Sequence, residues 1–80
     1  MKCINVQYFA LLREEAGVET ETLNVPCHTY AELYQYLQHK HNFTLPAQMI
    51  QVAVNDEFSL LSRNLSDGER IVFIPPVAGG

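Results

Sequence analysis

The residues best suited to chemistry in this chain are the last two, Gly79 and Gly80. Because they carry no side chain, they can enter a tunnel as narrow as the backbone, and no Cβ shields the terminal carbonyl carbon. An α-carboxyl group has a reference pKa of about 3.5, so it is ionised at neutral pH and is a poor electrophile. Adenylation with ATP makes such a carboxylate reactive, and a sulfur nucleophile that displaces AMP leaves a thiocarboxylate. The glycine pair alone is a weak signal, because flexible chain ends and cloning scars contain it too.

The residues before this pair predict a stiff, extended tail. Pro75 and Pro76 fix φ and provide no backbone donor, so the last strand must stop there. The tail 75–80 can reach roughly 20 Å at ~3.3 Å per residue, which is enough to cross a partner's surface and enter a cleft. Val77 can anchor the base of this tail, but nothing in 77–80 packs strongly, so we expect the free tail to be mobile. The sequence thus predicts a domain at 1–74 and a tail at 75–80.

Hydrophobic patterning predicts the elements that hold this tail. Alternating or β-branched residues predict strands at 3–9, 19–25, 50–54, 57–59 and 70–74. A short helix is expected at 10–16, ending at Gly17. A longer helix begins after Thr29, which forms a capping-box pattern with Glu32, and it ends near His41. Its apolar residues have the spacing of one buried stripe, namely Tyr30, Leu33, Tyr34 and Leu37.

The order of these elements predicts an α+β domain with a ubiquitin-like β-grasp fold. The expected sheet is mixed, has four to five strands and is covered by the main helix, with the short helix in addition. The first and last strands are expected to lie side by side and parallel at its centre.

One face of this sheet carries more apolar residues than solvent exposure explains. Alternation places Phe9 on the face away from the main helix, together with Val72 and Ile74 of the last strand. Phe58 of the short strand can join them. Large apolar residues on an uncovered face indicate a protein interface. The alternative is that a loop or the short helix covers them.

Length and charge limit the possible functions. With 80 residues, the chain is expected to form one domain, too small to enclose a deep active site. Its net charge of −4 argues against nucleic-acid binding, which depends on clustered basic residues. No apolar run approaches the ~20 residues that span a membrane, and no leader peptide is apparent, so we expect a cytoplasmic protein. Cys3 and Cys27 are expected to be buried, reduced thiols.

Residue types typical of other sites lack the required spacing. His39 and His41 lie two positions apart on a predicted helix and point about 200° away from each other, so they cannot easily share a metal ion. We therefore expect no metal site. Ser59, Ser62 and Ser66 have no nearby histidine and acid in a hydrolase pattern.

Taken together, these motifs resemble the MoaD-type family of ubiquitin-like sulfur carriers, the small subunits of molybdopterin synthase. The matching residues span nearly the whole chain and are Phe9-Ala10, Arg13-Glu14, Gly17, Val54-Asn55, Leu65-x-Asp67-Gly68-Glu69 and Phe73-x-Pro75-Pro76-Val77-x-Gly79-Gly80. The last block is the most specific. Ile74 departs from the family, which often has an aromatic residue there, and nothing in 39–48 carries over.

The resemblance implies a non-catalytic, sulfur-donating subunit that works in molybdenum cofactor biosynthesis. An E1-like enzyme would use ATP to adenylate Gly80, and sulfur from a donor protein would convert it to a thiocarboxylate, with Gly79 giving access. The tail would then enter the large catalytic subunit, typically in a heterotetramer, and supply sulfur for dithiolene formation. No cofactor would be bound permanently. The implied partner contacts are Phe9, Arg13, Phe58, Val72, Ile74, Pro75, Pro76, Val77 and Ala78.

Two other functions use the same tail chemistry. The first is a sulfur carrier for another pathway, such as thiazole synthesis, although those carriers usually lack the paired prolines. The second is a ubiquitin-like protein modifier or binding module that forms isopeptide links to lysines. The sequence does not exclude dual use.

Overall fold

The computed structural model of the chain describes residues 1–76, and predictions about Val77, Ala78, Gly79 and Gly80 therefore lie outside the described residues. The elements, in order, are β1 (Lys2–Tyr8), α1 (Leu11–Ala16), β2 (Thr20–Val25), α2 (Tyr30–His41), the 3₁₀ helix η1 (Ala47–Met49), β3 (Gln51–Val54), β4 (Glu57–Ser59) and β5 (Arg70–Ile74). Every element that the sequence predicts is present. The addition is η1, whose single turn is too short to produce a hydrophobic period.

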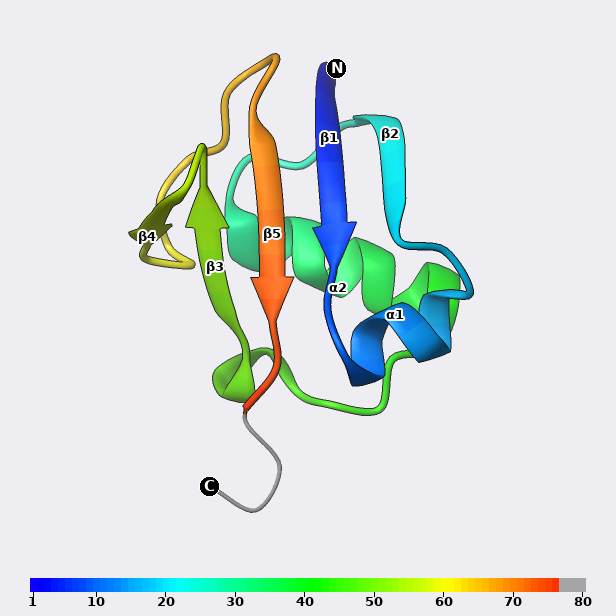
Figure 1. The fold of residues 1–80 in the computed structure, drawn as a ribbon. Helices are drawn as coiled ribbons and strands as arrows, with labels where there is room; N and C mark the ends of the chain where they lie inside the picture. The colour runs from blue at the N-terminus through cyan, green and yellow to red at the C-terminus, as the bar shows by residue number, and fades with distance from the viewer. Residues whose placement is uncertain (77–80) are drawn as a thin grey trace.

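The strands form one five-stranded mixed sheet in the order β2-β1-β5-β3-β4 (Figure 1). β1 and β5 are parallel neighbours, with Tyr8 opposite Phe73, whereas the other pairs are antiparallel. This arrangement confirms the β-grasp prediction. Because the two central strands run in the same direction, their C-terminal ends lie at the same edge of the sheet.

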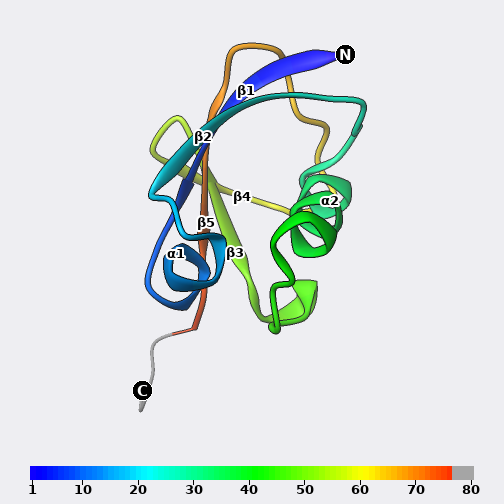
Figure 2. The same cartoon turned by 90° about the vertical axis from the view of Figure 1, so that its right-hand side faces the viewer.

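The hydrophobic core lies between the sheet and α2, which packs against one side of the sheet (Figure 2). The predicted helix stripe is buried, and so are the inward residues of β1 and β5. Burying a side chain such as Leu37 or Ile71 contributes about 1.5–3 kcal/mol to the free energy of unfolding. Leu12 of α1 is also fully buried, so the short helix is packed onto the same core.

The capping box of α2 is present with one difference from the usual pattern. The Oγ1 of Thr29 accepts a hydrogen bond from the backbone N–H of Glu32 at 3.1 Å. The Glu32 side chain accepts from the backbone N–H of His28 at 2.7 Å, one residue before the cap. Asn42 ends the helix in the left-handed conformation with φ 58°.

Two expectations about exposure were wrong. Val72 does lie on the face away from α2, between Gln7 and Ala53 of the neighbouring strands, but it is only 8% exposed. A short side chain at the centre of a five-stranded sheet is shielded by the side chains paired with it on both sides. Cys3 is exposed rather than buried, because it lies on that same outer face near the start of β1.

Both cysteines are free thiols, and Cys27 is half-buried.

In residues 1–76, no helix has the length and apolar character needed to cross a membrane.

Candidate functional site

An apolar groove of about 540 Å³ lies where β5 leaves the sheet. Seven apolar residues and one acid line it: Phe9, Ala10, Leu11, Glu14, Leu45, Ile74, Pro75 and Pro76. Three segments that are distant in the sequence supply them, namely the β1–α1 connection with α1 itself, the α2–η1 loop and the exit of β5. The groove therefore surrounds the point from which residues 77–80 continue.

The parallel pairing of β1 and β5 builds the first two walls of this groove. Tyr8 and Phe73 are opposite one another at the ends of their strands, and both are fully buried. The residues that follow these two in the sequence are Phe9 and Ile74, and both line the groove. The sequence predicted that these two side chains lie together on the outer face, and the structure brings them together. Their role in binding a partner stays a prediction.

Ala10 turns the chain sharply from β1 into α1. Its backbone has φ 52° and ψ −124°, a conformation that favours glycine. The turn is closed by a hydrogen bond from Leu12 N to Phe9 O at 3.1 Å. It places Leu11 and Glu14 at the groove, with Leu11 37% exposed. β1 thus ends one residue earlier than predicted, and Phe9 belongs to the turn.

The two prolines differ in exposure. Pro75 is buried, so it serves as part of the groove wall and is less available as a free contact than expected. Pro76 is exposed beside it. Proline lacks an N–H, so β5 cannot continue its hydrogen bonding past Ile74.

Phe58 forms a separate apolar feature. The register places it opposite Ala53, which is itself opposite Val72, so all three lie on the outer face. Phe58 is 73% exposed, but it does not line the groove. The expected continuous cluster is therefore two patches, with the buried Val72 in the sheet between them.

Sequence reasoning missed four groove residues, Ala10, Leu11, Glu14 and Leu45, and it predicted a contact at Arg13, which lies beside the groove. Arg13 is exposed on α1 but is not among the lining residues, whereas its neighbour Glu14 is. The sequence predicts Leu11 only as part of the short helix. An apolar residue on so short a helix could have indicated a contact surface. Leu45 lies in an irregular loop without periodicity, and no local pattern predicts where that loop packs.

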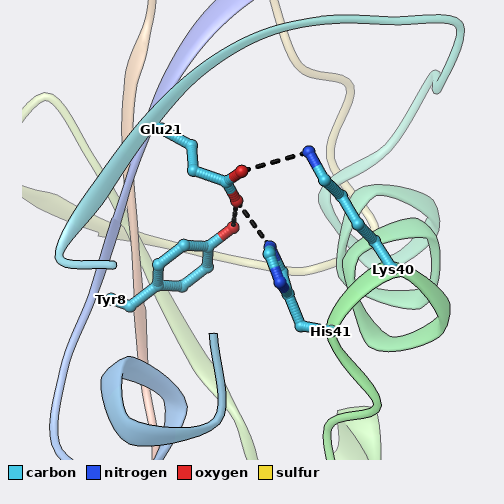
Figure 3. A network of polar contacts seen from close by, with 4 residues as sticks. All are labelled: Tyr8, Glu21, Lys40 and His41. Atoms are coloured by element: carbon cyan, nitrogen blue, oxygen red, sulfur yellow. Dashed lines mark hydrogen bonds and ion pairs between the residues drawn. The ribbon is translucent and has the colours of Figure 1, made fainter. Parts of the chain in front are cut away.

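A polar network joins β1, β2 and the end of α2 (Figure 3). Glu21 of β2 accepts hydrogen bonds from Tyr8 Oη at 2.6 Å and Lys40 Nζ at 3.0 Å, and its Oε1 lies 2.6 Å from His41 Nε2. Burial alone would raise the pKa of Glu21, but these bonds outweigh it and lower that pKa. Burial and the hydrogen bond to Glu21 raise the pKa of Tyr8.

This network is structural and offers no metal site. His41 is engaged with Glu21, while His39 is exposed on the other side of the helix. Across residues 1–76, no three His, Cys, Asp or Glu side chains are grouped so that they could hold a metal ion.

The tyrosines of α2 also have structural roles. Burial raises the pKa of Tyr34 to about 12, and its Oη donates to the backbone oxygen of Leu45 at 2.7 Å. Burial and a hydrogen bond to Glu69 raise the pKa of Tyr30. A phenol that stays protonated and bonded in this way supports the fold and is not available as a base.

Comparisons with known proteins agree on one family. The ThiS family profile matches residues 6–80. The molybdopterin synthase sulfur carrier subunit of Mycobacterium tuberculosis is 38% identical over 80 residues, which cover 96% of this chain and 96% of that subunit.

Solved structures with the same fold also match this chain. SAMP1 from Haloferax volcanii matches with a TM-score of 0.77 and 26% identity, over 98% of this chain and 99% of that one. One chain of the complex of subunits 1 and 2 of the molybdopterin-converting factor from Helicobacter pylori 26695 also matches. Its TM-score is 0.66 and its identity is 28%, over 98% of this chain and 99% of that one. With a matching profile over most of its length and a closely similar fold, the chain belongs to the ThiS family.

Proposed function

We propose that this chain is the sulfur carrier subunit of molybdopterin synthase and that the carboxyl group of Gly80 carries the sulfur. The observation that carries the proposal is the apolar groove at the exit of β5, directly before the residues that end in Gly79-Gly80. A partner that grips this groove holds the start of the tail. The 38% identity to a curated sulfur carrier subunit supports the same function.

The proposed chemistry needs no acid or base from this chain. An adenylating enzyme of the E1-like type would join the Gly80 carboxylate to the α-phosphate of ATP and release pyrophosphate. A sulfur nucleophile from a donor protein would then attack the carbonyl carbon and expel AMP. The thiocarboxylate would give up its sulfur in the synthase and return as a carboxylate. ATP is thus a substrate of the activating enzyme, and we expect no cofactor bound to this chain.

The proposed partner at the groove is the large catalytic subunit, in a heterotetramer of two small and two large subunits. The Helicobacter pylori structure is a complex of subunits 1 and 2 of the molybdopterin-converting factor, which supports a partner of this type. We place the reaction in the cytoplasm. The two free cysteines support a reducing compartment.

Reconstitution tests this function. The purified chain is incubated with an adenylating enzyme, ATP and a sulfide source, and is then given to the large subunit and a cyclic pyranopterin phosphate. We expect dithiolene formation with the intact chain and none after deletion of Gly80.

Three results would contradict the proposal. Dithiolene formation without Gly80 would show that its carboxylate carries no sulfur. Conjugates to lysines that require Gly80, without any thiocarboxylate, would favour the protein modifier instead, and a thiocarboxylate used only for thiazole would favour the other carrier.

A further inference from the structure

The third wall of the groove is formed by a loop in which Thr44 and Leu45 make no backbone–backbone hydrogen bond within the described residues, whereas Asn42, Phe43 and Pro46 do. Leu45 lies in the irregular segment 42–46 between α2 and η1, and it is half-buried against the core. Its position must therefore be fixed by side chains from neighbouring elements. This is also part of the stretch for which the sequence resemblance gives no expectation.

Both helices supply such side chains. On the α2 side, the backbone oxygen of Leu45 accepts from Tyr34 Oη at 2.7 Å and from Gln38 Nε2 at 3.2 Å. On the α1 side, Glu15 accepts from Thr44 N at 3.2 Å and from Thr44 Oγ1 at 2.8 Å. We name this last pair the Glu15–Thr44 latch.

The latch joins opposite walls of the groove. Glu15 follows Glu14 on α1, and α1 carries Leu11, so one end of the latch lies on the helix that forms the first wall. Thr44 precedes Leu45 and carries the third wall. Two hydrogen bonds to one carboxylate thus link these walls, in addition to the bonds from α2 to the Leu45 oxygen.

Charge at the groove restricts the partner further. Glu14 is the one charged side chain among the described lining residues, and the other seven are apolar. A partner segment that fills the groove must therefore bring an apolar side chain to Leu45 and Phe9. A basic side chain next to it would satisfy Glu14, and the net charge of −4 favours approach of such a segment.

We propose that the Glu15–Thr44 latch positions Leu45 so that the groove selects a segment of the large synthase subunit with an apolar side chain beside a lysine or arginine. This inference rests on the proposed function and names the part of the partner that the groove recognises. Thr44 and Glu15 act as positioning residues, whereas Leu45 and Glu14 make the contact. Leu45 is then a specificity determinant that no local sequence motif marks.

Binding of the unmodified chain to the purified large subunit of the same organism, measured by calorimetry, tests this proposal. We expect Leu45→Ala to weaken binding about tenfold, because a buried apolar contact is lost. Thr44→Val removes the hydroxyl and keeps the shape and the backbone bond, so it should weaken binding about threefold, and Thr44→Ser should restore it.

Matched controls separate this effect from a change in stability. Leu23 packs partly buried against the core at β2, away from the groove, so Leu23→Ala should change affinity by less than about twofold. Thr22→Val on exposed β2 is the control for Thr44→Val. Glu14→Gln should weaken binding at low salt and flatten its salt dependence, because the charge contribution is screened.

The possible failures are distinct. If the wild-type chain does not bind the large subunit, the proposed function is wrong and this inference falls with it. If the wild type binds and folded Leu45→Ala and Thr44→Val bind equally well, only the inference is wrong. Unchanged salt dependence in Glu14→Gln would overturn the basic residue assigned to the partner.

Discussion

At the scale of single residues, Glu21 shows how a partly buried charge is stabilised. It receives bonds from Tyr8, Lys40 and His41, which come from β1 and from the end of α2. The side chain of Glu21 is 16% exposed, so solvent does little to replace a lost partner. The carboxylate thus connects the edge strand β2 to the helix.

Replacing Glu21 should therefore weaken the fold in a pH-dependent way. We expect Glu21→Gln to lower the free energy of unfolding by about 1–2 kcal/mol at pH 7. Because the folded state lowers the pKa of Glu21, its contribution is full above the ordinary value of 4.5 and is lost as the pH falls through the lowered pKa. The difference between wild type and variant should shrink below about pH 4.5.

Urea denaturation across pH checks this prediction. Glu19→Gln is the matched control, because Glu19 is exposed just before β2, and it should change stability by less than about 0.5 kcal/mol. A difference that is constant from pH 7 to the acid range would contradict the role assigned to the Glu21 carboxylate.

The backbone conformation of Ala10 leads to a second prediction at the scale of single residues. At φ 52°, the Cβ of Ala10 strains the backbone. Glycine has no Cβ and would relieve a conformational free-energy cost of about 1–3 kcal/mol. Glycine also makes the unfolded chain more flexible, which offsets about 0.4–1 kcal/mol. We expect Ala10→Gly to raise stability by about 1 kcal/mol in thermal or chemical unfolding.

Ala16 at the end of α1 gives the comparison. It is helical, so Ala16→Gly should lower stability by about 0.5–1 kcal/mol. If both glycine substitutions destabilise the protein alike, Ala10 is not strained.

At the scale of elements, the helices and strands could be predicted, but the contacts between loops could not. The stripe of α2 and the alternation in β1 and β5 repeat over several residues, and a repeated pattern fixes which face is buried. The capping pair Thr29 and Glu32 is equally local. Leu45, in contrast, is held at the groove by Tyr34 of α2 and by its neighbour Thr44, whose partner Glu15 lies 29 residues away in the sequence.

The N-terminal cap of α2 leads to a testable prediction at the scale of elements. Thr29→Ala leaves the N–H of Glu32 without its bond at 3.1 Å, and we expect a loss of about 1 kcal/mol in unfolding free energy. Ser62→Ala, at an exposed turn, should have almost no effect. A cost below about 0.3 kcal/mol for Thr29→Ala would show that the Thr29 hydroxyl does not stabilise the helix.

At the scale of the whole molecule, the site could be predicted only in part. Parallel pairing of the first and last strands was enough to bring Phe9 and Ile74 together. The separation of Phe58 from them was not predictable, because it depends on how Val72 is shielded in the assembled sheet. Burial of a small side chain depends on its neighbours across strands, and local alternation does not include them.

The described part of the fold supports the proposal that the chemistry takes place on the tail. The described residues offer an apolar groove and a stabilising polar network, but no metal cluster. A domain of this size can hold a partner while its last residue is processed elsewhere. We therefore propose that the Gly80 carboxyl group carries the chemistry.

The intact mass of the chain, purified from its own cells, tests that claim most directly. We predict a fraction of molecules heavier by the difference between one sulfur and one oxygen atom, and fragmentation should place this difference on Gly80. The heavier fraction should disappear when the adenylating enzyme is absent. A single unmodified mass in cells that are actively making molybdenum cofactor, with cofactor synthesis intact after deletion of Gly79 and Gly80, would contradict it.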